Sequence, residues 1–369
     1  MNIKRIAVYQ VTLPLEHPYS LSGGRLKFEA LDSTLVSIES DDGIVGWGEG
    51  CPWGATYLPA FGKGIRAGLA EIAPQLLGRD PRALERINAV MDLALPGHLY
   101  VKSPLDTACW DLLGKAVGLP LCLLLGGRRD GPVALHSSIP TGDPSQMLAS
   151  VRAAQAKGYR IHSCKVGGSD IGADIARITH LMENLPAGQS LAFDANRAWL
   201  PAEAIQVMNA TAGLGGYYEQ PCETLDECLQ VRRMTRQPIA LDESIQRFQD
   251  AVWAQRHHAC EAIGLKLNRV GGLTKARRIR DFCVDMGLRM NIEETGGSVL
   301  ADTAAVHLAQ STPETHHRAT WLCHDMLTLD LAPGQGARNQ GGRAQAPELP
   351  GLGVEPDRSI LGDPVALYE

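Results

Sequence analysis

The chain of 369 residues is 44% hydrophobic and carries a formal net charge of −6. This length and apolar content allow a large core and more than one domain. The negative charge gives no electrostatic reason to expect a nucleic acid or an anionic membrane as partner. No apolar stretch approaches the roughly 20 residues that span a bilayer. Residues 1–5 lead into an alternating segment unlike a signal peptide, and nine scattered cysteines without CxxC pairs favour reduced thiols in a cytoplasmic protein.

Three β-like segments open the chain, over residues 6–13, 34–39 and 44–49. Residues 40–43, Ser-Asp-Asp-Gly, form a good hairpin turn between the last two. Helix-compatible sequence follows from about residue 60 to 93. The apolar spacing from Leu105 to Ala116 predicts an amphipathic helix that ends at Gly118. We therefore expect an α+β domain over residues 1–128.

Beyond residue 133, strand-like runs alternate with helical stretches such as 144–157 and 201–212, which indicates βα units and a parallel sheet. The expected strand starts lie near residues 133, 160, 190, 216, 238, 262, 289 and 319. The fold class is thus α/β, with a (β/α)7-8 TIM-type barrel over residues 129–330 whose first and last units are weakly marked. Residues 331–369 are expected to return to the N-terminal region and complete an α+β capping domain.

Five charged residues stand where strand-like runs end: Lys165, Asp194, Glu219, Asp242 and Lys266. By subtraction of their numbers, the gaps between them are 29, 25, 23 and 24 residues, close to the length of one strand-plus-helix unit. The carboxyl ends of the strands of a parallel barrel meet on one face. We therefore expect these five side chains to converge there.

Three carboxylates without a neighbouring histidine or cysteine form an oxygen-donor set, which suits Mg²⁺ better than zinc. A metal held by them has positions open for a substrate carboxylate and stabilises the charge that appears when an α-proton leaves. A lysine can be the base only if its pKa falls below the free value of about 10.4, and a divalent cation, a second ammonium and burial all act in that direction. The sequence therefore predicts a metal site between two bases.

At these residues the chain resembles the enolase superfamily, in particular the muconate-lactonizing-enzyme-like subgroup of the mandelate racemase/muconate lactonizing enzyme family. The resemblance implies that the two lysines are the acid/base pair and that the three carboxylates bind Mg²⁺. It also implies that Asn196 and Glu243 contact those ligands without binding the metal. Trp47-Gly48-Glu49, the helix around Trp110-Asp111 and the surroundings of Gly353 look like the family's capping domain.

Two departures from the family pattern narrow the subgroup. Where the family often has Lys-x-Lys on the second barrel strand, this chain has Ser163-Cys164-Lys165, so Ser163 offers a neutral hydrogen bond in place of a cation. The mandelate-racemase branch would need an Asp on the sixth strand as part of a His–Asp pair, and Lys266 stands there. That branch is therefore disfavoured.

Within the subgroup the chain resembles two enzyme types. Residues 162–165, 271–274 and 294–298 are similar to the cis-3-hydroxy-L-proline dehydratases. Residues 51–57 and a tryptophan at position 321 are similar to the hydroxyproline betaine epimerases. The segment 294–298, on the strand expected to touch the substrate, favours the dehydratases.

The substrate implied by either resemblance is a cyclic amino acid. The expected contacts are Tyr57, Ser163, Glu294, Thr295 and Trp321. Tyr57 or Trp321 could hold the cationic nitrogen over a ring face, an interaction worth about 0.5–2 kcal/mol. Because Glu293 and Glu294 are adjacent on a strand, only one of them is expected to point inward, and the family pattern favours Glu294.

We predict Mg²⁺-dependent dehydration, a β-elimination, of cis-3-hydroxy-L-proline to Δ1-pyrroline-2-carboxylate through a metal-stabilised enediolate. One lysine would take the C2 proton while the other protonates the departing hydroxyl, and competing epimerisation at C2 is expected. The alternatives are a 2-epimerase of hydroxyproline betaine or proline betaine, a dipeptide epimerase without a supporting motif on the eighth strand, and a non-catalytic binding barrel. The family resemblance also implies a homo-oligomer.

Overall fold

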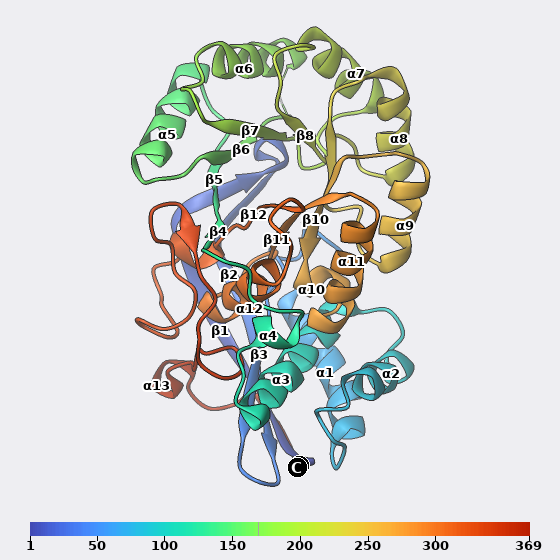
Figure 1. Ribbon diagram of the computed structural model, residues 1–369, viewed down its shortest axis with the longest axis vertical. Coiled ribbons are helices and arrows are strands. Elements are labelled where there is room, and N and C mark those ends of the chain that lie inside the picture. Colours follow the sequence, from blue (N-terminus) through green and yellow to red (C-terminus); the bar gives the residue numbers. More distant parts are fainter. Residues whose placement is uncertain (169) are drawn as a thin grey trace.

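The computed structural model describes residues 1–168 and 170–369. Figure 1 shows a parallel barrel with helices around its outside, above an antiparallel sheet with its own helices. Eight parallel strands in the described residues lie in sequence order. These barrel strands are β5 (His136–Ile139), β6 (Ile161–Lys165), β7 (Ser190–Asp194), β8 (Tyr217–Glu219), β9 (Ile239–Leu241), β10 (Ala262–Lys266), β11 (Arg289–Glu293) and β12 (His317–Ala319).

The barrel closes between its first and last strands. Leu135, just before β5, forms a parallel bridge with Thr320, just after β12. The amide of His136 donates to the Thr320 carbonyl over 3.0 Å, and the Thr320 amide donates to the Ala134 carbonyl over 2.9 Å. The predicted TIM-type barrel is therefore confirmed, with all eight strands present. The short strand β4 (Val133–Ala134) pairs outside the barrel with β13 (Arg343–Ala344).

Helices connect the strands and cover the outside of the barrel (Figure 1). They are α5 (Pro144–Ala156), α6 (Ile171–Glu183), α7 (Pro201–Ala210), α8 (Leu225–Met234), α9 (Phe248–Arg256), α10 (Leu267–Val270), α11 (Leu273–Asp285) and α12 (Val299–Gln310). After β12 the chain forms the 3-10 turn η2 (Cys323–Met326). The strand starts expected at 160, 190, 216, 238, 262 and 289 lie within one residue of the observed starts. The first and last strands, near 133 and 319, are displaced by two or three residues.

The N-terminal region folds into an antiparallel sheet of order β14-β1-β2-β3. Its strands are β1 (Ile3–Leu21), β2 (Leu26–Ser40), β3 (Val45–Gly50) and β14 (Ala366–Tyr368), and its helices are α1 (Gly62–Leu76), α2 (Leu84–Ala94), α3 (Leu99–Val117) and α4 (Leu121–Leu124). A last short helix, α13 (Arg358–Leu361), precedes β14. The predicted α+β cap is confirmed, and β14 shows the C-terminal segment returning to it. The boundaries at residues 128 and 330 stay predictions.

Helix α3 lies directly on strand β3 because two glycines of the strand permit close contact. A Cβ at Gly46 would stand 2.2 Å from the Ala108 carbonyl oxygen, and one at Gly48 would stand 2.0 Å from the Pro104 carbonyl oxygen. The helix ends where the sequence predicts, at Gly118, which has the left-handed φ of 69°. This close contact fixes the cap sheet against the helix that faces the barrel.

Strands β1 and β2 are longer than the segments 6–13 and 34–39 that the sequence predicted, and the tip of their hairpin reaches the mouth of the barrel (Figure 1). The tip is the 3-10 turn Ser22–Gly24. The Ser22 hydroxyl donates to the Asn196 carbonyl over 2.9 Å, which joins the tip to the loop after β7. The cap therefore contributes directly to the surroundings of the strand ends.

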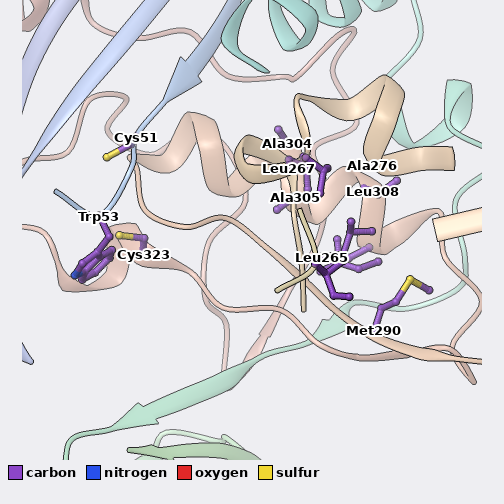
Figure 2. Packing of buried hydrophobic residues seen from close by; sticks show 14 of the residues in the cluster. Cys51, Trp53, Leu265, Leu267, Ala276, Met290, Ala304, Ala305, Leu308 and Cys323 are labelled. Atoms are coloured by element: carbon purple, nitrogen blue, oxygen red, sulfur yellow. The ribbon is translucent and has the colours of Figure 1, made fainter. Parts of the chain in front are cut away.

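Cap and barrel share one cluster of buried apolar side chains. Figure 2 shows part of it, with Leu265 and Met290 of neighbouring barrel strands packed against Leu308 of α12. In the same view Cys51 and Cys323 lie near Trp53, where a cap loop meets η2. All nine cysteines of the chain are buried free thiols. No helix among the described residues has the length and apolar character needed to cross a membrane.

Candidate active site

The barrel brings the five predicted charged residues together at the carboxyl ends of consecutive strands. Lys165, Asp194, Glu219 and Lys266 are the last residues of β6, β7, β8 and β10, and Asp242 directly follows β9. Lys165, Asp194 and Glu219 occupy the same level, because Lys165 pairs in register with Asp194 and Asp194 with Glu219. All five side chains belong to residues that are at most 9% exposed. The arrangement is a buried cluster of charge on one face of the barrel.

Each lysine contacts a carboxylate at one edge of the cluster. Lys165 Nζ lies 2.5 Å from Asp194 Oδ2, and Lys266 Nζ lies 3.0 Å from Asp242 Oδ2. Arg269, on α10, donates to Asp242 Oδ1 over 2.8 Å. Glu219, between the two aspartates, has a buried Oε2 with no hydrogen-bond partner among the described residues. Three buried acids thus share a region in which Glu219 Oε2 has neither a cation nor a hydrogen-bond donor beside it among the described residues.

The three carboxylates fit a hard divalent cation by donor type and by charge. All are oxygen donors, and burial together with Asp194 and Asp242 raises the pKa of Glu219 well above its ordinary value. Both the burial and the repulsion from the neighbouring acids disfavour the Glu219 anion, and a bound cation would offset them. The described residues do not converge as a ready-formed ligand group, because the two aspartates turn towards lysine and arginine. Binding therefore requires the cation to take the place of the lysine ammonium groups beside Asp194 Oδ2 and Asp242 Oδ2.

Both lysines are held as ammonium ions in this arrangement. Burial alone would lower the pKa of Lys165, but the Asp194 carboxylate, with Tyr19 and Glu219, raises it well above its ordinary value. Burial would also lower the pKa of Lys266. The Asp242 and Glu293 carboxylates outweigh it and raise that pKa above its ordinary value. Either lysine can act as a base only after a competing cation has taken over the carboxylate charge beside it.

Asp242 owes its room to a glycine on the next strand. A Cβ at Gly264 would stand 2.2 Å from Asp242 Oδ1 and 2.9 Å from its carboxyl carbon. Arg269, which also donates to the Gly264 carbonyl over 2.6 Å, holds the carboxylate in this space. Although burial acts in the opposite direction, Arg269 and Lys266 keep the pKa of Asp242 below its ordinary value. Arg269 was missed in the sequence, where a helical arginine after a strand is unremarkable.

A cavity opens directly above the cluster. Its wall consists of Tyr19, Leu21, Trp53, Tyr57, His136, Ser138, Ser163, Lys165, Asp194, Asn196, Glu219, Lys266, Glu293, Thr295 and Trp321. Four of the expected substrate contacts, Tyr57, Ser163, Thr295 and Trp321, belong to this wall. The fifth expected contact, Glu294, does not.

The inward acid on β11 is Glu293 rather than Glu294. Successive side chains of a strand point to opposite faces, and Glu293 is the one that faces the cavity. Glu294 instead accepts a hydrogen bond of 2.9 Å from the Asn268 amide behind the cavity. Local alternation could not decide which of the two adjacent acids faces inward, because that depends on the register of β11 against β10.

Asn196 and Glu243 form a hydrogen-bonded group beside the cluster. The Asn196 amide proton is donated to Asp194 Oδ1 over 2.8 Å, and Asn196 Nδ2 donates to Glu243 Oε1 over 3.1 Å. The Tyr57 hydroxyl donates to the same Glu243 oxygen over 2.8 Å. Burial, with Asp242 and Asp194, raises the pKa of Glu243 to about 7. Tyr57 is thereby fixed with its ring at the cavity wall.

Several wall residues carry no local signal in the sequence. Trp53 packs against Trp321 with ring centroids 5.7 Å apart, and against Tyr19 at 5.2 Å. Tyr19 and Trp53 come from the cap, so only the docking of the hairpin and the following loop brings them here. His136 and Ser138 are two residues apart on β5 and so share a face, but Ser137 between them is also polar, so no polar alternation marked which face points inward.

The fold and site define a capped barrel enzyme with an oxygen-donor cluster between two lysines. Residues 146–360 match the family model described as enolase C-terminal domain-like, and residues 4–126 match the N-terminal domain of mandelate racemase/muconate lactonizing enzyme. The chain belongs to the mandelate racemase/muconate lactonizing enzyme family of the enolase superfamily.

Individual relatives are similar over most or all of their length. A cis-3-hydroxy-L-proline dehydratase of Roseibium aggregatum is 44% identical, with 100% of both chains covered. A solved enolase-superfamily structure from Roseovarius nubinhibens, complexed with magnesium, is 55% identical with a TM-score of 0.96 and covers 100% of this chain and 99% of its own. A hydrophobic dipeptide epimerase of Enterococcus faecalis is 32% identical over 84% of this chain and 87% of its own.

Proposed function

We propose that the protein is a Mg²⁺-dependent dehydratase that converts cis-3-hydroxy-L-proline to Δ1-pyrroline-2-carboxylate and water. The observation that carries this proposal is the pair of buried lysines on either side of three carboxylates at the base of a small cavity. The full-length similarity to a dehydratase of that substrate supports it. The sequence pattern of β11 and its following loop supports the same choice.

Asp194, Glu219 and Asp242 would hold the cation. Bound there, Mg²⁺ would neutralise the acids and stabilise the negative charge that develops on the substrate carboxylate. Asn196 and Arg269 would keep the aspartates in place through the hydrogen bonds that they already make. The tip of the β1–β2 hairpin and the aromatic residues of the wall would exclude water.

The lysines supply the proton transfers. In cis-3-hydroxy-L-proline the carboxylate and hydroxyl share one face of the ring, so the C2 hydrogen points to the opposite face. One lysine removes the C2 proton, and its nitrogen becomes an ammonium. The C3–O bond breaks as the other lysine gives its proton to the hydroxyl, which leaves as water. The resulting enamine tautomerises to the cyclic imine acid, as C3 gains a proton and the ring nitrogen loses one.

A second candidate is 2-epimerisation of a proline or hydroxyproline betaine. The aromatic wall formed by Tyr57, Trp53 and Trp321 favours it, because ring faces attract a quaternary ammonium. The same two lysines would then remove the C2 proton from one face and return a proton to the other. This route leaves the hydroxyl in place, which makes the two functions separable by product. Assembly into a homo-oligomer also stays a prediction.

The deciding experiment incubates the protein and Mg²⁺ in D₂O with cis-3-hydroxy-L-proline and, separately, with hydroxyproline betaine. We expect formation of the imine acid from the free amino acid, which NMR and trapping with 2-aminobenzaldehyde would detect. Omission of the metal or addition of a chelator should abolish the reaction. Deuterium exchange at C2 of the betaine without loss of water, and no turnover of the free amino acid, would select the epimerase instead.

A further inference from the structure

Glu293 and His136 form a hydrogen-bonded pair across the seam where the barrel closes. Glu293 ends β11 and His136 begins β5, and β12 lies between these two strands. Glu293 Oε2 lies 2.8 Å from His136 Nε2. Since a carboxylate only accepts, Nε2 carries the proton and donates it to Glu293. Both residues are at least nine-tenths buried and both belong to the cavity wall.

The pair leaves two acceptor atoms without a hydrogen bond among the described residues. Glu293 Oε1 is 3.6 Å from Lys266 Nζ, longer than a hydrogen bond. His136 Nδ1 is buried and has no hydrogen-bond partner among the described residues. Burial acts to raise the pKa of Glu293, but His136 and Lys266 outweigh it, so the carboxyl stays ionised. A buried anion with an uncommitted oxygen is costly unless a cation or donor meets it.

Building on the proposed function, we propose that Glu293, oriented by His136, binds the secondary ammonium of the substrate ring. The site would thereby select amino acids whose nitrogen carries N–H groups over quaternary betaines. The pairing would be a charge-assisted hydrogen bond in a water-excluded cavity, which is the setting in which such bonds are strongest. His136 is a positioning residue, since it acts through the carboxylate that it fixes.

The topology places this contact on the correct side of the substrate. The three carboxylates that would hold the cation follow β7, β8 and β9, so the substrate carboxylate is drawn to that side. Glu293 lies beyond Lys266 and pairs with it in register across β10 and β11. In a proline ring C2 joins the carboxylate to the nitrogen. A ring bound between the two sides therefore presents C2 near Lys266.

The aromatic wall cannot provide this selection by itself. A ring face attracts a secondary and a quaternary ammonium alike, because the attraction depends on charge and needs no N–H group. A carboxylate oxygen gains a hydrogen bond only from nitrogen that carries hydrogen. Among the wall carboxylates, Asp194 and Glu219 are assigned to the cation, so Glu293 is the one left to distinguish the free amino acid from its betaine.

The test measures binding by calorimetry in the presence of Mg²⁺, with three ligands that cannot lose water: L-proline, N,N-dimethyl-L-proline and cyclopentanecarboxylate. The wild-type protein should bind L-proline the tightest. Glu293→Gln, which keeps the size of the side chain and a partner for His136, should weaken L-proline binding by roughly 10- to 100-fold. Cyclopentanecarboxylate has no nitrogen, so its affinity should change least.

The variant His136→Asn should lower the preference for L-proline over N,N-dimethyl-L-proline and still show a cooperative thermal unfolding transition. If His136 had a purely structural role, the ligand preference would not change in a folded variant. Equal losses for all three ligands in Glu293→Gln would overturn the proposal. If that variant does not fold, the wild-type series decides, because equal affinity for L-proline and cyclopentanecarboxylate also overturns it. Dehydration of cis-3-hydroxy-L-proline is assayed separately, so failure of the proposed function leaves the binding result interpretable.

Discussion

Single residues at the barrel mouth carry charge in a space where unpaired charge is costly. Asp242 illustrates how the chain manages this. Two cations, Lys266 and Arg269, contact it, and the missing side chain of Gly264 gives it room. Glu219 by contrast keeps an unpaired oxygen. The residues that position Asp242 therefore matter as much as the carboxylate itself.

Replacement of Gly264 by alanine should displace the Asp242 carboxylate. The new Cβ would stand 2.2 Å from Oδ1, closer than any non-bonded contact, so the carboxylate must move. We expect Mg²⁺ affinity, measured by calorimetry, to fall at least about tenfold, a loss of about 1.4 kcal/mol. The matched control is Gly142→Ala, which lies outside the left-handed region and whose added Cβ meets its nearest atoms at 3.7 and 3.9 Å, ordinary contact distances. Unchanged metal affinity in Gly264→Ala would contradict the role assigned to Asp242.

Replacement of Lys266 by alanine tests the proton transfers. A positioned acid or base contributes about 10²- to 10⁴-fold, so water loss from cis-3-hydroxy-L-proline should fall by that order. Exchange of the C2 hydrogen with D₂O falls as well if Lys266 is the base, and persists if Lys165 is. Comparison with Lys165→Ala then assigns the two faces. Wild-type rates of both processes in Lys266→Ala would remove this residue from the mechanism.

Secondary-structure elements of cap and barrel are joined by one buried carboxylate. Glu49, at the end of β3, accepts hydrogen bonds of 2.9 and 2.6 Å from the amide and hydroxyl of Ser298, where α12 begins. It also accepts from the Ser33 hydroxyl over 2.6 Å and from the Ala301 amide over 3.2 Å. A negative charge at a helix N-terminus is favourable. This residue therefore docks the cap sheet on a barrel helix.

Replacement of Glu49 by glutamine should weaken that docking. The amide group turns donors towards donors, which leaves buried groups unsatisfied at a cost of about 1–3 kcal/mol. We expect a lower midpoint of thermal unfolding by calorimetry. Ser298→Ala removes only part of the same network and should lower it less. A Glu49→Gln protein that melts with the wild type would show that the apolar contacts alone hold cap and barrel together.

The part of the site that the sequence could predict is the part set within single strand-plus-helix units. The regular spacing of Lys165 and Lys266 relative to the three acids is visible in the sequence, because each residue stands at the end of one strand of a repeating unit. The contributions of Tyr19 and Trp53 are not local, because they depend on where the hairpin lands. The choice between Glu293 and Glu294 depends on register, which one sequence does not settle. Local periodicity thus located the charges, and tertiary contacts decided the wall.

Distant segments of the molecule meet at His307, a buried histidine that is neutral. His307 of α12 accepts from the Cys122 amide at Nδ1 over 3.1 Å and faces the Leu352 carbonyl with Nε2 over 2.9 Å. It thereby joins the barrel to α4 and to the C-terminal segment. Burial lowers the pKa of His307 to about 4. Protonation would put a second N–H against the Cys122 amide.

Stability should therefore fall with acid in a defined window. The unfolded His307 has a pKa of about 6.5 and binds a proton that the folded one, with a pKa of about 4, does not. Its contribution is fully present above pH 6.5 and is lost as the pH falls towards 4. His307→Gln can keep both hydrogen bonds but cannot titrate. The free energy of unfolding, measured with denaturant between pH 4 and 6.5, should depend less steeply on pH in this variant, by up to about 1.4 kcal/mol per pH unit. Identical pH dependence in the wild type and the variant would contradict the assignment.

The rates at which the nine buried thiols react with a labelling reagent can report how often each part of the molecule opens. Only a thiolate reacts with an alkylating reagent, and burial raises the pKa of Cys109 and Cys323 well above its ordinary value. Labelling therefore waits for a local or global opening event. Cys109 lies in the cap, whereas Cys164 and Cys283 lie in the barrel. The order in which these cysteines become modified, followed by mass spectrometry, therefore reports whether the cap or the barrel opens first. No probe has to be introduced.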